Sequence, residues 1–129
     1  MANKHKGANA ERELLHMLSE QGFAVVRVAG SGMISETSAD LIAGNSFKRF
    51  VIECKTCKDK KRYLEKQQIA DLKEFACKFG FPALIAVKFN RQGWWFIEPE
   101  KLEDTGKGLA IYLEDIQKIG KSFDEIVKN

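Results

Sequence analysis

Two short apolar segments with charged residues inside them, at residues 38–43 and 50–55, constrain the fold of this chain more than any other feature. Both are partly β-branched, and the sequence Gly-Asn-Ser between them is typical of a turn, so they predict two neighbouring strands. Side chains alternate between the two faces of a strand, which puts Glu53 and Lys55 on the same face. If the turn closes in the middle of that sequence, Asp40 falls diagonally across from Glu53.

An aspartate and a glutamate held this close disfavour each other's ionisation unless a positive charge lies between them. Diagonal neighbours in a hairpin lie about 7–8 Å apart, close enough for two carboxylates to share one divalent cation through oxygen ligands. The simpler alternative is a surface hairpin with a Glu53–Lys55 ion pair on its solvent-exposed face. That alternative accounts for those two residues but not for Asp40.

The composition is that of an ordinary folded protein, because 44% of the 129 residues are hydrophobic and 30% are charged. We expect one domain over residues 1–129, a length that can form a hydrophobic core. No apolar run is long enough to span a membrane, and the first residues lack the apolar region of a signal peptide, so a cytoplasmic location is expected. Three cysteines, an odd number, fit a reducing compartment.

The basic residues are unevenly distributed, although the net charge is only +3. Residues 48–62 hold seven lysines or arginines and two acids, whereas residues 98–129 hold eight acids and five lysines. A solvated charged loop is the usual explanation for such a basic run. Beside a metal site, the run instead favours an anionic substrate such as a nucleic acid backbone.

Residues 8–21 predict an amphipathic helix, with Asn9 or Gly7 as its N-cap and Gly22 after its last turn. The expected buried stripe consists of Leu14, Leu15 and Leu18.

Glu11 shares the face of this stripe because it precedes two of the leucines by three and four residues. A carboxylate at the inward edge of a helix is costly unless it is paired or binds a cation. The alternative is an acid that the dipole at the helix N-terminus stabilises. Glu13 and Glu20 fall on the outer face and are interpreted as ordinary surface residues.

Further strands are expected at residues 23–28, where Arg27 interrupts the apolar run, and at residues 83–89 and 94–97. The last of these, Trp-Trp-Phe-Ile, puts large apolar side chains on both faces of a strand. Helices or a second subunit must cover them. We therefore expect part of the segment 84–97 at a subunit contact.

A basic loop at residues 58–62 precedes a predicted helix over about residues 64–79. Gln67 and Gln68 lie near the start of this helix, within reach of the strands that carry the carboxylates. The core stripe would consist of Ile69, Leu72, Ala76 and Phe79, with Phe75 beside it.

Other patterns carry less functional information. The segment 30–38 is either a substrate-contacting loop or a mere connection, because it matches no phosphate-binding motif. Cys54 and Cys57 lack the second Cys or His pair that a zinc site needs. A capping-box pattern at residues 122–125 predicts a short final helix, whereas residues 109–119 are ambiguous between strand and helix.

The constellation that carries chemistry is Glu11, Asp40, Glu53 and Lys55. Two or three carboxylates can hold Mg²⁺, which keeps several waters and takes only one or two protein carboxylates. The metal would lower the pKa of a bound water and balance charge on a phosphate. Lys55 would position that water or donate to the developing anion, so the set predicts a phosphodiester hydrolase.

Asp40 followed by the sequence Glu-Cys-Lys at residues 53–55 resembles the PD-(D/E)XK nuclease signature, with Ala39 in place of the proline. A wider and more specific match is to archaeal Holliday junction resolvases. The segments similar to that family are residues 6–14, 22–27, 29–31, 75–80, 86–89 and 93–94. The resemblance spans about residues 4–98.

The resemblance implies a homodimeric, metal-dependent endonuclease that cuts four-way DNA junctions, with Mg²⁺ as cofactor and Mn²⁺ as a substitute. The residues implied to be catalytic are Glu11, Ser31, Asp40, Glu53 and Lys55, of which Glu11, Asp40 and Glu53 would bind the metal. The implied DNA contacts are Lys6, Arg12, Arg27 and Ser31, to which the charge of the basic loop adds Lys58, Lys60, Lys61 and Arg62. Phe75 and Phe79 match aromatic positions of the family's second helix.

The expected fold is therefore α/β, a restriction-endonuclease-like mixed central sheet flanked by helices. The expected function is resolution of Holliday junctions by paired nicks in recombination and repair, with specificity from DNA shape and backbone contacts. The alternatives are another structure- or sequence-specific nuclease on the same core, and a non-catalytic DNA-binding module. The acidic set argues against the module, because a pure binder gains nothing from carboxylates beside phosphates.

Overall fold

The computed structural model describes residues 2–28 and 39–128, with the side chains of residues 2–6 left outside that description. In chain order the elements are α1 (Ala2–Glu20), β1 (Ala24–Arg27), β2 (Leu41–Gly44), β3 (Arg49–Cys57), β4 (Lys61–Leu64), α2 (Lys66–Phe79), β5 (Ala83–Phe89), β6 (Gly93–Ile97), η2 (Pro99–Lys101), β7 (Glu103–Asp104), β8 (Leu109–Tyr112), α3 (Leu113–Ile119), β9 (Lys121–Ser122) and α4 (Phe123–Val127).

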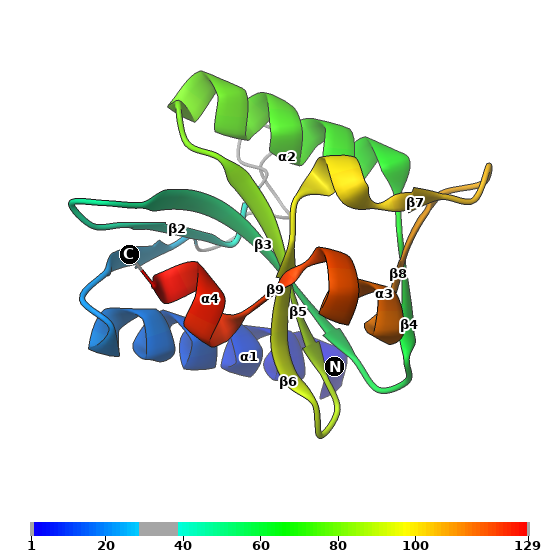
Figure 1. Cartoon of the computed structure of the whole chain (residues 1–129), viewed down its shortest axis with the longest axis horizontal. Coiled ribbons are helices and arrows are strands. Elements are labelled where there is room, and N and C mark those ends of the chain that lie inside the picture. The colour runs from blue at the N-terminus through cyan, green and yellow to red at the C-terminus, as the bar shows by residue number, and fades with distance from the viewer. Residues whose placement is uncertain (1, 29–38, 129) are drawn as a thin grey trace.

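The central sheet has six strands in the order β1-β2-β3-β5-β6-β9. β3 and β5 run parallel, whereas the other neighbouring pairs are antiparallel, so the sheet is mixed as the sequence predicted. Figure 1 shows α1 and α2 on opposite sides of this sheet, with α4 near α1.

Two hydrophobic clusters, one on each face of the sheet, form the core. Leu84 and Ala86 of β5 belong to the cluster beneath α1 and α4, while Ile85 and Val87 belong to the cluster beneath α2 and α3. This alternation is what a strand buried on both faces requires. The prediction of a central strand from the apolar run at residues 83–89 is confirmed.

Helix α1 begins at Ala2, six residues before the predicted start. Asn9 and Gly7 are therefore inside the helix and do not cap it, because residues favoured at caps are tolerated within a helix at a cost of about 1 kcal/mol or less. The end is close to the prediction, since Gly22 follows the last turn with a φ of 87°. Leu14 and Leu18 are fully buried and Leu15 is half-buried.

Helix α2 ends at Gly80, whose φ of 85° lets its amide donate to the carbonyls of Ala76 and Cys77. Its predicted core residues Ile69, Leu72 and Ala76 are buried. The prediction is wrong for Phe79, which is 46% exposed. This ring lies at the very end of the helix and packs edge-on against Phe81, with centroids 4.8 Å apart.

The basic segment is only partly a loop. β3 continues to Cys57, and Lys61 and Arg62 belong to β4, which pairs with β8 in a second sheet of order β4-β8-β7. The ambiguous segment 109–119 contains both a strand, β8, and a helix, α3. The final helix is confirmed, with a capping box between Ser122 and Glu125.

The apolar residues of β6 are covered within one chain. Trp94 and Phe96 are buried in the cluster with α1 and α4, and Ile97 is buried in the cluster with α2 and α3, against which the half-buried Trp95 also packs. Their bulk therefore gives no support to a subunit contact at residues 84–97. Helices of the same chain cover both faces of β6, which is one of the two ways in which the sequence analysis expected these side chains to be covered.

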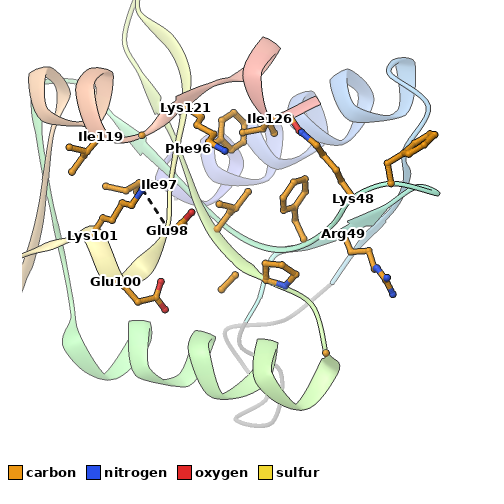
Figure 2. A pocket seen from close by; sticks show the side chains of 17 residues that line it. Lys48, Arg49, Phe96, Ile97, Glu98, Glu100, Lys101, Ile119, Lys121 and Ile126 are labelled. Carbon is orange, nitrogen blue, oxygen red and sulfur yellow. Dashed lines mark hydrogen bonds and ion pairs between the residues drawn. The ribbon is translucent and has the colours of Figure 1, made fainter. Parts of the chain in front are cut away.

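A hollow of about 740 Å³ lies where β3 and β5 begin. Figure 2 shows the Glu98–Lys101 ion pair in its wall and Lys48 reaching toward Ile126, whose carbonyl accepts from Lys48 Nζ at 3.0 Å. None of the carboxylates predicted to bind metal lines this hollow.

No described helix is long and apolar enough to cross a membrane. The cytoplasmic location stays a prediction.

Candidate active site

Asp40 and Glu53 meet where β2 begins beside β3. The paired register ends at Leu41 and Ile52, and Asp40 and Glu53 are the next residues beyond that pair. Their carboxyl groups are close enough for a hydrogen bond between the two side chains. Asp40 is anchored twice: its amide donates to Ile52 O at 2.9 Å, and its Oδ2 accepts from Cys54 N at 2.8 Å.

Glu53 is a buried carboxyl, 6% exposed, on a strand covered by helices. Burial raises its pKa to about 9, and a hydrogen bond with Asp40 and the charge of Asp40 act in the same direction. Lys55 opposes the rise. A proton shared between Asp40 and Glu53 removes the repulsion between their two negative charges. A cation bound at the same place would do so as well.

Glu11 approaches this pair from α1. Its Oε1 accepts from Arg27 Nε at 2.9 Å, and both side chains are largely screened from solvent. Burial raises the pKa of Glu11 and the charge of Asp40 adds to the rise, whereas Arg27 opposes it through the hydrogen bond and its charge. The helix places Glu11 on its inward edge as the leucine stripe predicted.

Lys55 lies two residues after Glu53 and points to the same face. Its Nζ donates to Gln68 Oε1 at 3.0 Å and lies 3.8 Å from Glu53 Oε2. Gln68 comes from α2, so the prediction that this helix reaches the site is confirmed for that residue. Gln67 turns outward and donates to Asp71 instead.

The arrangement fits a divalent cation held chiefly by the Asp40–Glu53 pair. Among the described side chains, residues 7–28 and 39–128, no three His, Cys, Asp or Glu residues converge as a ready-made ion site. Glu11 is engaged by Arg27, so direct ligation by Glu11 remains a prediction. One or two carboxylates are what Mg²⁺ takes when it keeps several waters.

The family described as archaeal Holliday junction resolvase (Hjc) matches residues 2–128. The chain belongs to this family. It is 37% identical over 123 residues to the crossover junction endodeoxyribonuclease Hjc of Archaeoglobus fulgidus, covering 95% of this chain and 90% of that protein. It is 39% identical over 122 residues to the Methanocaldococcus jannaschii protein of the same name, covering 95% and 86%.

The structure of Archaeoglobus fulgidus Hjc, described as a Holliday junction resolvase from an archaeal hyperthermophile, superposes on this resolvase with a TM-score of 0.87. The superposition shows 35% identity and covers 95% of this chain and all of the other. The family and the restriction-endonuclease-like fold predicted from the sequence are both confirmed.

The residues predicted to contact DNA in this resolvase fall into different environments. Lys58, Lys60 and Lys61 are exposed beyond the end of β3, as is Arg12 on α1. Arg27 is committed to Glu11 and Arg62 is half-buried. Ser31 and the side chain of Lys6 lie outside the described part of the chain.

Sequence reasoning missed the role of Glu13. It was interpreted as an ordinary surface acid, but its Oε2 accepts from Lys88 Nζ at 2.6 Å and its Oε1 accepts from Trp94 Nε1 at 2.9 Å. The hydrogen bond with Lys88 lowers the pKa of Glu13. Burial raises this pKa, and the hydrogen bond with Trp94 lowers it further. The signal available in the sequence was the tryptophan, because a buried indole N–H needs an acceptor.

Proposed function

We propose that this resolvase cuts four-way DNA junctions with Mg²⁺, or Mn²⁺ as a substitute, held by Asp40 and Glu53 with Glu11 beside them. The observation that carries the proposal is the contact between two carboxyls beside a covered sheet, where burial raises the pKa of Glu53 to about 9. Such a buried carboxyl pair destabilises the fold, and binding of a cation in place of the shared proton explains why it is present.

The cation, when bound, supplies a water of lowered pKa and balances charge on the phosphate. The chain's own residues hold and orient the reacting groups. Lys55, fixed by Gln68, places its ammonium beside Glu53, where it can orient the attacking water or donate to the developing anion. Arg27 holds Glu11 in place and opposes the rise in its pKa, which favours the negative charge that a cation needs.

We further propose a two-fold homodimer, because resolution requires two symmetric cuts and one chain offers one set of Asp40, Glu53 and Lys55. The support in this chain lies at the end of α2. Phe79 is exposed beside Phe75 and Phe81, with ring centroids 5.8 and 4.8 Å from its own. Exposed aromatic surface of this kind marks an interaction site, and here a second copy is its proposed occupant.

Cleavage and binding of a labelled junction test the proposal when they are measured separately. Asp40→Asn and Glu53→Gln should lose cutting in Mg²⁺ but keep binding in Ca²⁺, because removal of negative charge near phosphate does not weaken association. The matched control is Glu74→Gln, an exposed acid on α2, which should cut normally. Full cleavage by either site variant would overturn the metal assignment. Linear duplex, flap and single strand alongside the junction distinguish a resolvase from a less selective nuclease.

A further inference from the structure

Arg62 contains a buried donor with no acceptor. Its Nε is inaccessible to solvent and has no hydrogen-bond partner among the described residues. No ion pair of residues 39–128 involves its guanidinium. A buried, unsatisfied arginine nitrogen is costly to a fold, so this side chain is better explained by a ligand that arrives from outside.

The alternation of β4 separates Arg62 from its basic neighbour. Arg62 is paired in register with Ile111 of β8 and shares its face with Leu64, which is buried in the core. Lys61 and Tyr63 occupy the opposite, exposed face. Arg62 is therefore not part of a solvated basic loop.

A hollow of about 430 Å³ lies in front of Arg62 and adjoins the active site. Its walls are the small residues Gly7 and Ala10 of α1, the end of β3 over residues 54–57, and the turn leading into β4. Lys55 belongs both to this wall and to the active site. A Cβ on Gly7 would meet nothing within 4 Å, so the α1 side of the hollow is open.

The charge of the hollow suits an anion. Its lining contains the four cations Lys55, Lys58, Lys61 and Arg62 and the single acid Asp59. The ammonium of Lys61 lies on the other face of β4, with its Nζ 4.3 Å from the ring centroid of Tyr63 and 5.0 Å from that of Tyr112. Two aromatic faces hold this ammonium there, so Lys61 adds positive charge near the hollow while Arg62 is the cation placed to bind inside it.

We propose that this hollow binds a backbone phosphate of the DNA strand being cut, adjacent to the scissile phosphate, and that the Arg62 guanidinium is its ligand. The inference rests on the proposed nuclease function and adds a positioning residue to it. A guanidinium presents parallel donors that match two phosphate oxygens, which fixes orientation as well as charge. Binding there would hold the strand so that the next phosphate lies at Asp40 and Glu53.

A phosphate-neutralisation scan tests the inference. Junctions that carry one methylphosphonate at each position around the cut are bound in Ca²⁺ by the wild type, by Arg62→Gln and by Lys107→Gln. The control removes a lysine that is exposed in the same small sheet region and lies outside the hollow. Arg62→Gln should weaken binding about tenfold and reduce the salt slope by about 1. One methylphosphonate beside the cut should weaken binding by the wild type and by Lys107→Gln but not by Arg62→Gln.

Equal sensitivity of wild type and Arg62→Gln at every phosphate would overturn the inference. Arg62→Lys keeps the positive charge but lacks the two parallel donors of a guanidinium. Compared with Arg62→Gln, it should restore the salt slope of the wild type, while the position of the cut becomes less uniform. Thermal melts of the variants show that they are folded. If inorganic phosphate stabilises the wild type but no DNA phosphate is coupled to Arg62, the hollow is a small-anion site and the DNA assignment falls. Loss of the proposed function would look different, because the wild type would then bind junctions without cutting them in Mg²⁺.

Discussion

Arg27 donates from Nε to Glu11 Oε1 at 2.9 Å, joining the end of β1 to α1 beside the paired carboxyls. The contact has an electrostatic consequence for the site. Burial and the charge of Asp40 raise the pKa of Glu11, and Arg27 is the group that lowers it most. We therefore propose that Arg27, which the family resemblance implies to contact DNA, also positions Glu11, one of the proposed active-site acids.

Arg27→Ala should reduce cleavage by about 10–100-fold, the usual effect of removing a partner that orients a metal site. The reason is that Glu11 would lose its charge partner and its fixed orientation. The measurement is the rate of junction cleavage as a function of Mg²⁺ concentration, which should shift to higher concentrations. Lys73→Ala, which removes an exposed cation from α2, should leave the curve unchanged.

A Glu11→Gln background separates this role from direct DNA binding. If Arg27 acts through Glu11, adding Arg27→Ala to Glu11→Gln should cost little further activity. A full additive loss would instead show that Arg27 acts on DNA alone.

Gln68→Ala should lower the cleavage rate about tenfold, with junction affinity in Ca²⁺ nearly unchanged. The physical reason is that Lys55 Nζ donates to Gln68 Oε1 at 3.0 Å and would lose that restraint. Single-turnover cleavage at saturating enzyme measures the effect. The neighbouring residue provides a matched control, because Gln67 points outward to Asp71. Equal losses in Gln67→Ala and Gln68→Ala would contradict the assignment.

The sequence predicted those features that depend on local pattern. Short apolar, partly β-branched segments indicated the strands around Glu53, and the continuous apolar run at residues 83–89 indicated the central strand β5. The capping box at Ser122 indicated α4. The proximity of Asp40 and Glu53 was predicted from the two segments and the turn between them, because the turn and the hydrophobic pattern set the register of a hairpin.

Features that depend on distant contacts could not be predicted from pattern alone. Glu13 meets Lys88 across 75 residues of sequence, so no helical spacing indicates it. Arg62 is placed inward by the pairing of β4 with β8, and that pairing requires a strand where the charge run suggested a loop. Phe79 has the spacing of a core residue, but it is the last residue of α2 and is 46% exposed.

Glu53→Gln should stabilise the protein without metal, and the gain should increase with pH. The folded pKa of Glu53, about 9, is raised above its ordinary value of 4.5. This carboxyl therefore favours folding fully below about pH 4.5, and its contribution is lost as the pH rises toward 9. A glutamine has no such dependence. Melting temperatures in EDTA should differ little at pH 5 and clearly at pH 8.

The controls for this prediction use a surface acid and the metal. Glu100→Gln, an exposed substitution, should show no growing difference with pH. Addition of Mg²⁺ should raise the melting temperature of the wild type but not that of Glu53→Gln, because a ligand that binds only the folded state stabilises it. A constant difference between pH 5 and pH 8 would mean that Glu53 is ionised in the metal-free fold.

The proposed homodimer makes the last prediction. Sedimentation at micromolar concentration should report about twice the 14.6 kDa mass of one chain. Phe79→Ser should shift the mass toward that of one chain, since it removes the exposed ring at the end of α2. Phe47→Ser is the control, because Phe47 is 73% exposed in the turn between β2 and β3, and it should leave the mass unchanged.

Dimerisation should also be visible in the products of the reaction. A heterodimer of one wild-type subunit and one Glu53→Gln subunit should nick only one strand of a junction, because each subunit supplies one site. Phe79→Ser should bind junctions more weakly and yield single nicks in place of paired cuts, while Phe47→Ser resolves them normally. Because a two-fold pair of sites is what coordinates two symmetric cuts, a stable monomer that made both cuts would refute the dimer and the paired-site mechanism together.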